Sequence, residues 1–310
     1  MKIVFMGTPH AAVASLARIM DDGHQVVAVY TQPDKPAGRG NKISFSPVKQ
    51  FALDHDLPIF QPSKVRTPEA LEEFRSHGAD AAVVVAYGRI LPESFLSAFA
   101  MGAINVHFSL LPKYRGAAPV NWAIVHGEKV SGVTTMQMDV GLDTGPILMQ
   151  RAAEIDENET APELMQKLSV LGADLLSETL SDFETIAPKT QNELEASMAP
   201  IMKKEDGLIS WMLNARDISN RVRGFQPFPT AFTFFRGKKL TVWSSIVVES
   251  AHELLRPGEI IEASGDRLLI FCGGDSVLQI NELQLEGKRR VSSRDFLNGV
   301  RPEIGEVFGS

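Results

Sequence analysis

The chain has 310 residues, of which 44% are hydrophobic and 22% charged, and its net charge is −7 at pH 7. This composition is typical of a soluble globular protein, and no run of about 18 apolar residues could span a membrane. The length exceeds what one core usually fills, so we expect two domains. The negative charge argues against a general nucleic-acid binder. The single cysteine, Cys272, excludes an intramolecular disulfide and, with no signal or transit peptide recognisable in MKIVFMGTP, favours a cytoplasmic protein.

Apolar strands alternate with amphipathic helices along the first half of the chain. We expect strands at residues 2–6, 25–30, 58–60, 81–86 and 103–108, and helices at 11–21, 48–55, 68–76 and 93–99. This alternation predicts a Rossmann-like, mostly parallel sheet with helices on both faces. Ligands of such sheets bind at the carboxyl ends of the strands, so we expect functional residues just after Ala86, Phe108 and Met138.

The second half of the chain changes character after one long helix, expected at residues 161–185. Residues 187–206 are polar and contain prolines but lack periodicity, which is typical of a linker. A helix at 215–224 and short strands separated by glycine-containing turns then predict a small antiparallel β-barrel of the OB type. We therefore expect a first domain at 1–186 and an OB-like domain at 207–310. The net charge is about −8 before residue 207 and about +1 from there on.

Polar side chains alternate with apolar ones in INVHFS, residues 104–109. If this segment is a strand, Ile104 and Val106 point to one face, and Asn105 and His107 to the other. A lone histidine on a strand is more often a hydrogen-bonded structural group than a catalyst. The strand ends, however, in SLLPKYRGAAP, a loop marked by proline and glycine that suits a ligand pocket. We therefore interpret Asn105 and His107 as candidate functional residues.

The segment MQMDVGLDTGP, residues 136–146, carries two aspartates beside glycines that allow close backbone approach. Its simpler interpretation is a hairpin whose aspartates form the turn. Together with Asn105 and His107, a carboxylate suits acyl transfer, because the amide and imidazole can stabilise an oxyanion while the carboxylate orients the histidine. The sequence lacks GxGxxG after the first strand, Walker, HExxH and GxSxG motifs, so we expect no dinucleotide, metal or serine nucleophile. Direct attack by a substrate amine is the simpler mechanism.

Several segments, in order along nearly the whole chain, resemble the methionyl-tRNA formyltransferase family: FMGTP, TQPDKPAGRG, VVAYGRILP, INVHFSLLPKYRGAAP, GVTTMQMDVGLDTG and VRGFQPFPTAF. The wider group of 10-formyltetrahydrofolate-dependent formyltransferases shares the Asn-x-His pair and the SLLP segment. The resemblance implies an enzyme of translation initiation that transfers the formyl group of 10-formyltetrahydrofolate to the α-amino group of methionine on initiator methionyl-tRNA. It implies no metal, membrane or protein partner.

The same resemblance implies which residues act. Asn105, His107 and Asp143 would form the catalytic trio. Asn105 and a protonated His107 would stabilise the oxyanion, while Asp143, with a water, would hold His107 and help to remove the proton of the amine. The folate site would include the SLLP segment and one residue near the pterin, namely Ser109, Leu110, Leu111, Pro112 and Ile90.

Basic side chains gather in the loop at residues 31–50 and in the second half of the chain. The commoner meaning of such a cluster is a solvated surface. The resemblance makes the loop the element that enters near the acceptor stem, with Arg39 as the best candidate contact. Phosphate binding would make the tRNA affinity depend on salt. The candidate tRNA contacts are Lys35, Arg39, Lys42, Lys49, Lys203, Lys204, Arg221, Arg223, Lys238 and Lys239.

Two features depart from the pattern of the family. Pro146 stands where an acid is common, and Gln226, Phe228 and Thr230 alter the turn FQPFPT.

Two other interpretations are open. The chain could be a folate-dependent formyltransferase for an amino sugar nucleotide or a purine precursor, although the basic loop and GLDTG argue against it. It could also be a non-catalytic, folate-sensing RNA-binding protein, against which the complete catalytic trio speaks.

Overall fold

The computed structural model describes residues 1–37, 42–249 and 255–309. By their internal contacts the residues form two compact units, each assembled from three stretches of chain. Unit 1 comprises Met1–Pro119, Val130–Glu154 and Met165–Ala199, and unit 2 comprises Val120–Lys129, Ile155–Leu164 and Pro200–Ser310. Within the described ranges, no helix has both the length and the apolar character that crossing a membrane requires.

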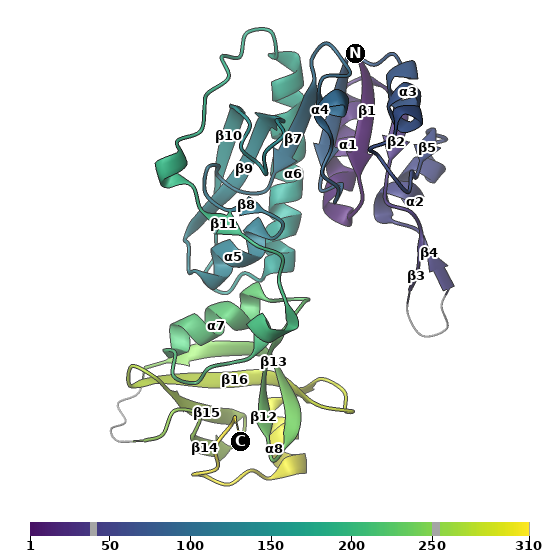
Figure 1. The fold of residues 1–310 in the computed structure, drawn as a ribbon. Coiled ribbons are helices and arrows are strands. Elements are labelled where there is room, and N and C mark those ends of the chain that lie inside the picture. Colours follow the sequence, from purple (N-terminus) through teal and green to yellow (C-terminus); the bar gives the residue numbers. More distant parts are fainter. Residues whose placement is uncertain (38–41, 250–254, 310) are drawn as a thin grey trace. The chain divides into compact units, whose positions relative to one another are not determined.

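Unit 1 is built on a seven-stranded sheet in the order β10-β9-β7-β6-β1-β2-β5 (Figure 1). Its strands are β1 (Lys2–Gly7), β2 (Gln25–Tyr30), β5 (Ile59–Phe60), β6 (Ala81–Val85), β7 (Ala103–His107), β9 (Val130–Gln137) and β10 (Ile147–Glu154). The first five strands pair in parallel, whereas β9 is antiparallel to both β7 and β10. The apolar run AAVVV of β6 is buried throughout, as expected for a parallel strand covered on both faces.

Helices α1 (Val13–Asp21) and α6 (Ala161–Ser181) cover one face of this sheet. Arg18 on α1 and Asp174 on α6 form an ion pair, with 2.6 Å between Nη1 and Oδ1. Gly172 on α6 packs closely on β7, since a Cβ at this glycine would lie 3.0 Å from Cγ1 of Val106. Val106 therefore points toward α6, and the face it occupies is the apolar one predicted from the alternation in INVHFS.

The opposite face of the sheet packs against α3 (Pro68–Ser76) and α4 (Glu93–Leu96). Its buried cluster includes Phe74 of α3, Phe95 of α4 and Ala103 at the start of β7. Because side chains alternate along a strand, Asn105 and His107 share this face with Ala103. The predicted division of β7 into an apolar and a polar face is confirmed.

Outside its main sheet, the described part of unit 1 contains two short strand pairs, one antiparallel and one parallel, and three further helical segments. Strands β3 (Lys35–Ala37) and β4 (Lys42–Ser44) form an antiparallel hairpin. Strand β8 (Arg115–Gly116), in the loop after β7, pairs in parallel with β11 (Met198–Ala199). The helical segments are η1 (His10–Ala12), α2 (Pro47–Asp54) and η2 (Glu193–Glu195). The β8–β11 pairing brings the last residues of unit 1 to the loop that follows β7.

Unit 2 is an antiparallel β domain with helices. Its sheet has the order β12-β13-β16-β15-β14, and β17 pairs with β16 (Figure 1). The strands are β12 (Ala231–Phe235), β13 (Lys238–Val248), β14 (Ile260–Ser264), β15 (Arg267–Cys272), β16 (Ser276–Leu285) and β17 (Val291–Ser292). The helices are α5 (Pro119–Val125), η3 (Lys204–Gly207), α7 (Ala215–Gly224) and α8 (Ser293–Val300). Trp211 is buried in the core and donates its Nε1 hydrogen to Oγ1 of Thr233 at 3.0 Å. The predicted fold class, a mostly parallel α/β sheet followed by an antiparallel β domain, is confirmed.

Helix boundaries agree with the sequence where a capping residue marks them. α3 and α7 span the predicted residues, and Thr67 and Asn214 accept backbone N–H groups at their first turns. The helices predicted at 93–99 and 161–185 are too long, because α4 ends at Leu96 and α6 at Ser181. After α6 the carbonyl of Asp182 accepts the N–H groups of two later residues and closes a turn. The helix predicted from residue 11 begins as the 3₁₀ turn η1.

Candidate active site

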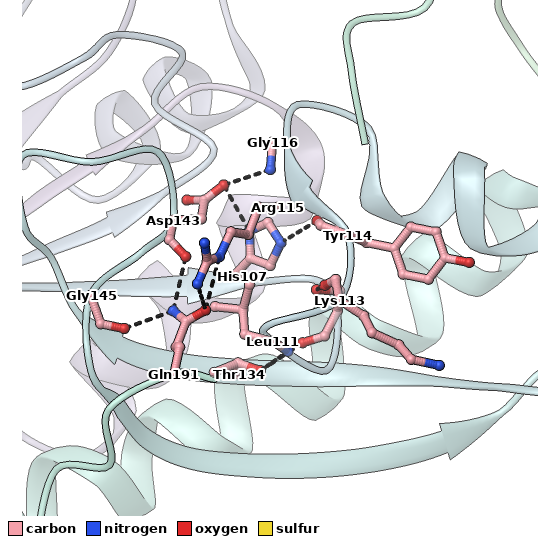
Figure 2. A network of polar contacts seen from close by, with 11 residues as sticks. His107, Leu111, Lys113, Tyr114, Arg115, Gly116, Thr134, Asp143, Gly145 and Gln191 are labelled. Atoms are coloured by element: carbon pink, nitrogen blue, oxygen red, sulfur yellow. Dashed lines mark hydrogen bonds and ion pairs between the residues drawn. The ribbon is translucent and has the colours of Figure 1, made fainter. Parts of the chain in front are cut away.

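His107 is the last residue of β7, and its ring is held by the backbone of the following loop. Its Nε2 lies 2.9 Å from the carbonyl oxygen of Tyr114, and its side chain is 6% exposed. A carbonyl can only accept, so Nε2 carries the hydrogen and donates it. Tyr114 has a φ of 61°, a left-handed conformation that is uncommon outside glycine and that turns this carbonyl toward the ring. Nδ1 is therefore the nitrogen left to face the site (Figure 2).

Asp143 faces that free nitrogen. Its Oδ2 lies 3.6 Å from Nδ1 of His107, and it accepts the backbone N–H of Gly116 at 2.8 Å (Figure 2). The separation from Nδ1 is an ion-pair distance and too long for a hydrogen bond. The Gly116 N–H fixes the position of Oδ2, because it donates to it. The two side chains thus form an imidazole–carboxylate pair in which Nδ1 of His107 faces the carboxylate.

Asp143 reaches His107 by a route that the sequence did not indicate. β9 runs antiparallel to β7 and pairs Gln137 with Ile104 and Thr134 with His107. The residues after Met138 therefore begin beside the amino end of β7. We expected them at the edge of the sheet where the parallel strands have their carboxyl ends, and this expectation is wrong. The hairpin interpretation of this segment is confirmed, since β9 pairs with β10 and the loop between them carries Asp143. The loop both forms a turn and delivers the carboxylate.

Asn105 lies two positions before His107 on the same face of β7. It is 8% exposed, and its neighbours in the ladder are Val84 of β6 and Met136 of β9. Within the described part of the chain, no hydrogen bond joins the Asn105 side chain to another residue. An amide that is this buried ordinarily has a partner. Its donors are therefore available to a bound group.

The SLLP segment folds as a compact loop over β9. The Ser109 hydroxyl donates to the Lys113 carbonyl at 2.6 Å, and the Leu111 N–H donates to Oγ1 of Thr134 at 3.1 Å. Leu110 packs against β9, where a Cβ at Gly132 would lie 2.6 Å from its Cδ2. The peptide bond between Leu111 and Pro112 is cis. These contacts fix the loop through its backbone and through Ser109.

Ile90 is 64% exposed and lines an open pocket of about 520 Å³ in unit 1. The other lining residues are Ser63, Lys64, Val65, Arg66, Thr67 and Arg89. Arg89 donates to Oε1 of Gln32 at 3.2 Å and to the carbonyl of Ser63 at 2.6 Å. No residue of the SLLP segment is among the described residues that line this pocket. The structure therefore brings Asp143 to His107, whereas Ile90 lines a pocket together with basic side chains.

The four basic residues predicted in the loop at 31–50 have different surroundings. Arg39 lies outside the described residues. Lys35 and Lys42 lie on the two strands of the β3–β4 hairpin. Lys49 forms an ion pair with Asp34 and donates to Oε1 of Gln61 at 2.8 Å. The hydrogen bond from Lys49 lowers the pKa of Asp34, because it favours the ionised carboxylate. The ion pair of Lys49 and Asp34 lies at the base of the hairpin.

The six basic residues predicted in unit 2 also differ. Lys203, Lys204 and Lys238 are exposed, and the Lys239 ammonium lies 4.0 Å from the ring centroid of Phe232. The remaining two are committed to their own unit. Arg221 reaches the carbonyl of Asp206 at 3.4 Å, and Arg223 donates to Oδ1 of Asn220 and to the carbonyls of Asp156 and Glu159. Burial lowers the pKa of Arg223.

Four residues of the site were not predicted from the sequence. Tyr114 and Gly116 act through the backbone, Arg115 through a buried guanidinium, and Gln191 through its amide. The first three lie in YRG of the loop after β7, which the sequence marked as a ligand loop without assigning these atoms. Gln191 lies in the stretch that the sequence predicted to be a linker, and it has no local signal. Only the fold brings it within reach of the Asp143 loop.

The departures from the family pattern have ordinary partners. The Gln226 amide donates to the carbonyls of Val222 and Trp243, at 3.0 and 2.9 Å. The carbonyl of Pro146 accepts the N–H of Gln137 at 3.0 Å, at the end of the β9–β10 loop. Phe228 is 48% exposed. None of these residues contacts His107 or Asp143 among the interactions of the described residues.

The chain matches two sequence families. Residues 1–180 match the family described as formyl transferase, and residues 201–301 match the one described as formyl transferase, C-terminal domain. The methionyl-tRNA formyltransferase of Solibacter usitatus is 48% identical to this chain over 311 aligned residues, which cover 100% of this chain and 99% of that protein. Similarity at this level spans both units.

Solved structures share the fold. A methionyl-tRNA formyltransferase from Clostridium thermocellum superposes with a TM-score of 0.57 at 18% identity, covering 81% of this chain and 94% of that one. WlaRD, a sugar 3N-formyl transferase crystallised in the presence of dTDP and 5-N-formyl-THF, gives a TM-score of 0.66 at 21% identity, covering 93% of this chain and 99% of that one. At these identities the likeness concerns the fold alone.

Proposed function

The chain belongs to the family of methionyl-tRNA formyltransferases, and we propose that it transfers the formyl group of 10-formyltetrahydrofolate to the α-amino group of methionine on initiator methionyl-tRNA. The observation that carries this proposal is the pair of His107 and Asp143, with 3.6 Å between Nδ1 and Oδ2. Beside it, the Asn105 amide has the donors that an oxyanion requires. The three groups together suit transfer of an acyl group to an amine.

The chain's own residues divide the work of this transfer. The folate co-substrate supplies a formyl group on a nitrogen that an amine can displace. Asn105 donates an amide hydrogen to the formyl oxygen, where negative charge develops as the amine attacks. His107 presents Nδ1, because Nε2 is occupied by the Tyr114 carbonyl, and in its protonated form it adds a second donor.

Asp143 handles the proton of the amine. Its carboxylate, directly or through a water, accepts the proton that the methionine nitrogen loses as its bond to the formyl carbon forms. The bond from the formyl carbon to the folate nitrogen breaks, and that nitrogen takes up a proton in return. His107 lies next to the Asp143 carboxylate, with 3.6 Å between Nδ1 and Oδ2. One carbon–nitrogen bond forms, one breaks, and the proton count balances.

We assign the folate to the loop after β7 and to the pocket at Ile90. Residues Ser109 to Pro112 support this assignment because their backbone is fixed by Lys113 and Thr134, which gives a ligand a rigid wall. The pocket at Ile90 adds an apolar surface between Lys64, Arg66 and Arg89, a composition suited to a ring system that carries carboxylates. The cytoplasmic location and the absence of a metal stay predictions.

We assign the tRNA to the β3–β4 hairpin and to basic side chains of unit 2 that are exposed or partly exposed. Lys203, Lys204, Lys238 and Lys239 support this role, because none of them forms an ion pair within the described residues. Such side chains release counterions when they neutralise phosphates. Lys49, Arg221 and Arg223 already have partners in the protein, so their contribution to tRNA binding is expected to be smaller.

A transfer assay tests the proposed function. The protein is incubated with 10-formyltetrahydrofolate labelled in the formyl carbon and with methionylated initiator tRNA, and the label in precipitated tRNA is measured. We expect transfer to initiator methionyl-tRNA and much less to elongator methionyl-tRNA. Transfer to an amino sugar nucleotide or a purine precursor instead would replace the proposed substrate. Binding of tRNA without any labelled product would favour a non-catalytic RNA-binding protein.

A further inference from the structure

The loop that carries Asp143 has little packing of its own to hold it. Val140 and Leu142 are 67% and 52% exposed, and Asp143 itself has a φ of 53°. A residue other than glycine is strained in this left-handed region, although aspartate tolerates it better than most residues. Within the loop, Oδ1 of Asp139 accepts the Gly141 N–H at 3.0 Å and the Thr144 hydroxyl at 2.7 Å. Neither of these bonds reaches Asp143, so a contact from outside the loop is needed to hold its backbone.

Gln191 supplies that contact. Its Nε2 donates to the carbonyl of Asp143 at 2.9 Å and to the carbonyl of Gly145 at 2.7 Å (Figure 2). A primary amide has two N–H groups, and here each of them has one acceptor. Gln191 is 6% exposed, so water does not readily replace these bonds. One buried side chain thus fixes the backbone at Asp143 itself and two residues further on.

Arg115 fixes the orientation of the Gln191 amide. Its Nε and Nη2 donate to Oε1 of Gln191 at 3.0 and 2.8 Å. If the amide were rotated by half a turn, its N–H groups would face the guanidinium donors and its oxygen would face two carbonyls. Arg115 is held in turn by Glu193, whose two carboxylate oxygens accept at 2.9 and 2.8 Å. These hydrogen bonds raise the pKa of Arg115, which keeps the guanidinium charged.

Three consecutive residues hold both members of the His107–Asp143 pair. The Tyr114 carbonyl accepts from His107, the Gly116 N–H donates to Asp143, and Arg115 between them acts through Gln191 (Figure 2). The segment that contains Gln191 is itself tied to this tripeptide, because the Arg115 N–H donates to the Ser197 carbonyl at 2.8 Å. The contacts form a closed ring around the imidazole–carboxylate pair.

We propose that Gln191, oriented by Arg115, is a positioning residue that holds Asp143 opposite His107, a role that rests on the proposed function. The stretch at residues 191–199 is then part of the catalytic unit as well as a connection. Asp143 and Gln191 lie 48 positions apart in the chain, yet they act together, because the Gln191 amide holds the backbone that carries the carboxylate. Loss of this hold lets the carboxylate drift, and a displacement of about 1 Å costs up to about 100-fold in rate.

The variant Gln191→Ala tests the proposal against a matched control. Gln137→Ala removes a glutamine of the same unit that also bridges two carbonyls, those of Met101 and Ala103 at 3.1 and 3.3 Å, but does not touch the Asp143 loop with its side chain. We expect Gln191→Ala to lower kcat about 10-fold to 100-fold while KM for both substrates stays within about twofold. Gln137→Ala should lower the melting temperature by about as much as Gln191→Ala does, but it should leave kcat unchanged. Equal kcat values for the two variants would overturn the proposal.

A double-variant cycle separates positioning from general damage. If Gln191 acts through Asp143, then Gln191→Ala should change kcat by less than about twofold in an Asp143→Asn background. A full second loss in that background would show that Gln191 acts elsewhere. The wild-type protein is assayed in parallel, so that failure of formyl transfer itself is distinguished from failure of the positioning role.

A further variant keeps the test decisive if Gln191→Ala does not fold. Glu193 has a side chain that is 72% exposed, so Glu193→Ala should fold, yet it removes the outer support of Arg115. We expect kcat to fall about threefold with KM unchanged, a smaller effect because Gln191 remains. Glu195→Ala is the control, since Glu195 accepts from Asn192 at 2.8 Å and does not contact Arg115. Equal activity of these two variants would contradict the proposal.

Discussion

The polar groups of the two units are arranged in opposite ways. In unit 1, His107 and Arg115 are buried, and their ring and guanidinium atoms form hydrogen bonds of 2.9 and 3.0 Å. In unit 2, Lys238 and Lys239 lie at the surface without ion pairs among the described residues, and Lys239 rests on a phenylalanine ring. Catalysis by the buried groups of unit 1 depends on the angles and distances between atoms, whereas binding by the lysines of unit 2 depends on the number of charges. We therefore expect substitutions in the two units to differ in size, in salt dependence and in which kinetic constant they change.

The largest effects are expected in the imidazole–carboxylate pair. His107→Ala and Asp143→Asn should each lower kcat by about 100-fold or more, since these groups act mainly in the transition state. Thermal unfolding should show that both variants fold. Asp174→Asn, which removes a carboxylate of the exposed ion pair with Arg18 in the same unit, is the control and should leave kcat unchanged. Wild-type turnover in either site variant would refute the assignment and remove the contrast between the units.

The next largest effect is that of salt on tRNA binding. Raising the salt concentration from about 50 to about 200 mM should weaken the apparent tRNA affinity by at least about tenfold, because several phosphates are neutralised. The affinity of the folate co-substrate, measured in the same buffers, should change much less. Titrations of fluorescently labelled tRNA provide the slope of log affinity against log salt. A flat slope would show that unit 2 does not act through its charges.

A single basic side chain of unit 2 should have a moderate effect. Lys239→Ala should weaken tRNA binding about fivefold and reduce the salt slope by about 1, with kcat at saturating tRNA unchanged. Arg267→Ala removes the same charge from the same unit, but Arg267 is already paired with Glu262 at 2.8 Å. This control should bind tRNA almost as tightly as the wild type. Equal loss in both variants would mean that only the overall charge matters.

The smallest effect is expected at the single cysteine. Cys272 is buried in the core of unit 2, and burial raises the pKa of its thiol to about 12. The thiolate is therefore scarce near pH 8, and alkylating reagents should not modify the folded protein. Mass spectrometry after treatment with iodoacetamide measures this directly. Rapid modification under native conditions would show that the core of unit 2 opens readily.

Local sequence patterns were sufficient for the elements and for part of the site. The alternation in INVHFS placed Asn105 and His107 on one face of β7, and the structure confirms this. Residues 68–76 and 215–224 form helices as predicted, because each begins with a capping side chain. These features depend on neighbours two to four positions apart, so their periods are visible in the chain itself.

Tertiary structure decided the rest of the site. The sequence alone determined that an amide, an imidazole and a carboxylate were present, but it did not indicate that Asp143 approaches along an antiparallel hairpin or that Gln191 holds its loop. It also did not distinguish exposed lysines such as Lys238 from Lys49, which is paired with Asp34. The physical reason is that hydrogen bonds and ion pairs between segments far apart in the chain depend on how sheets and loops pack. No local period records that packing.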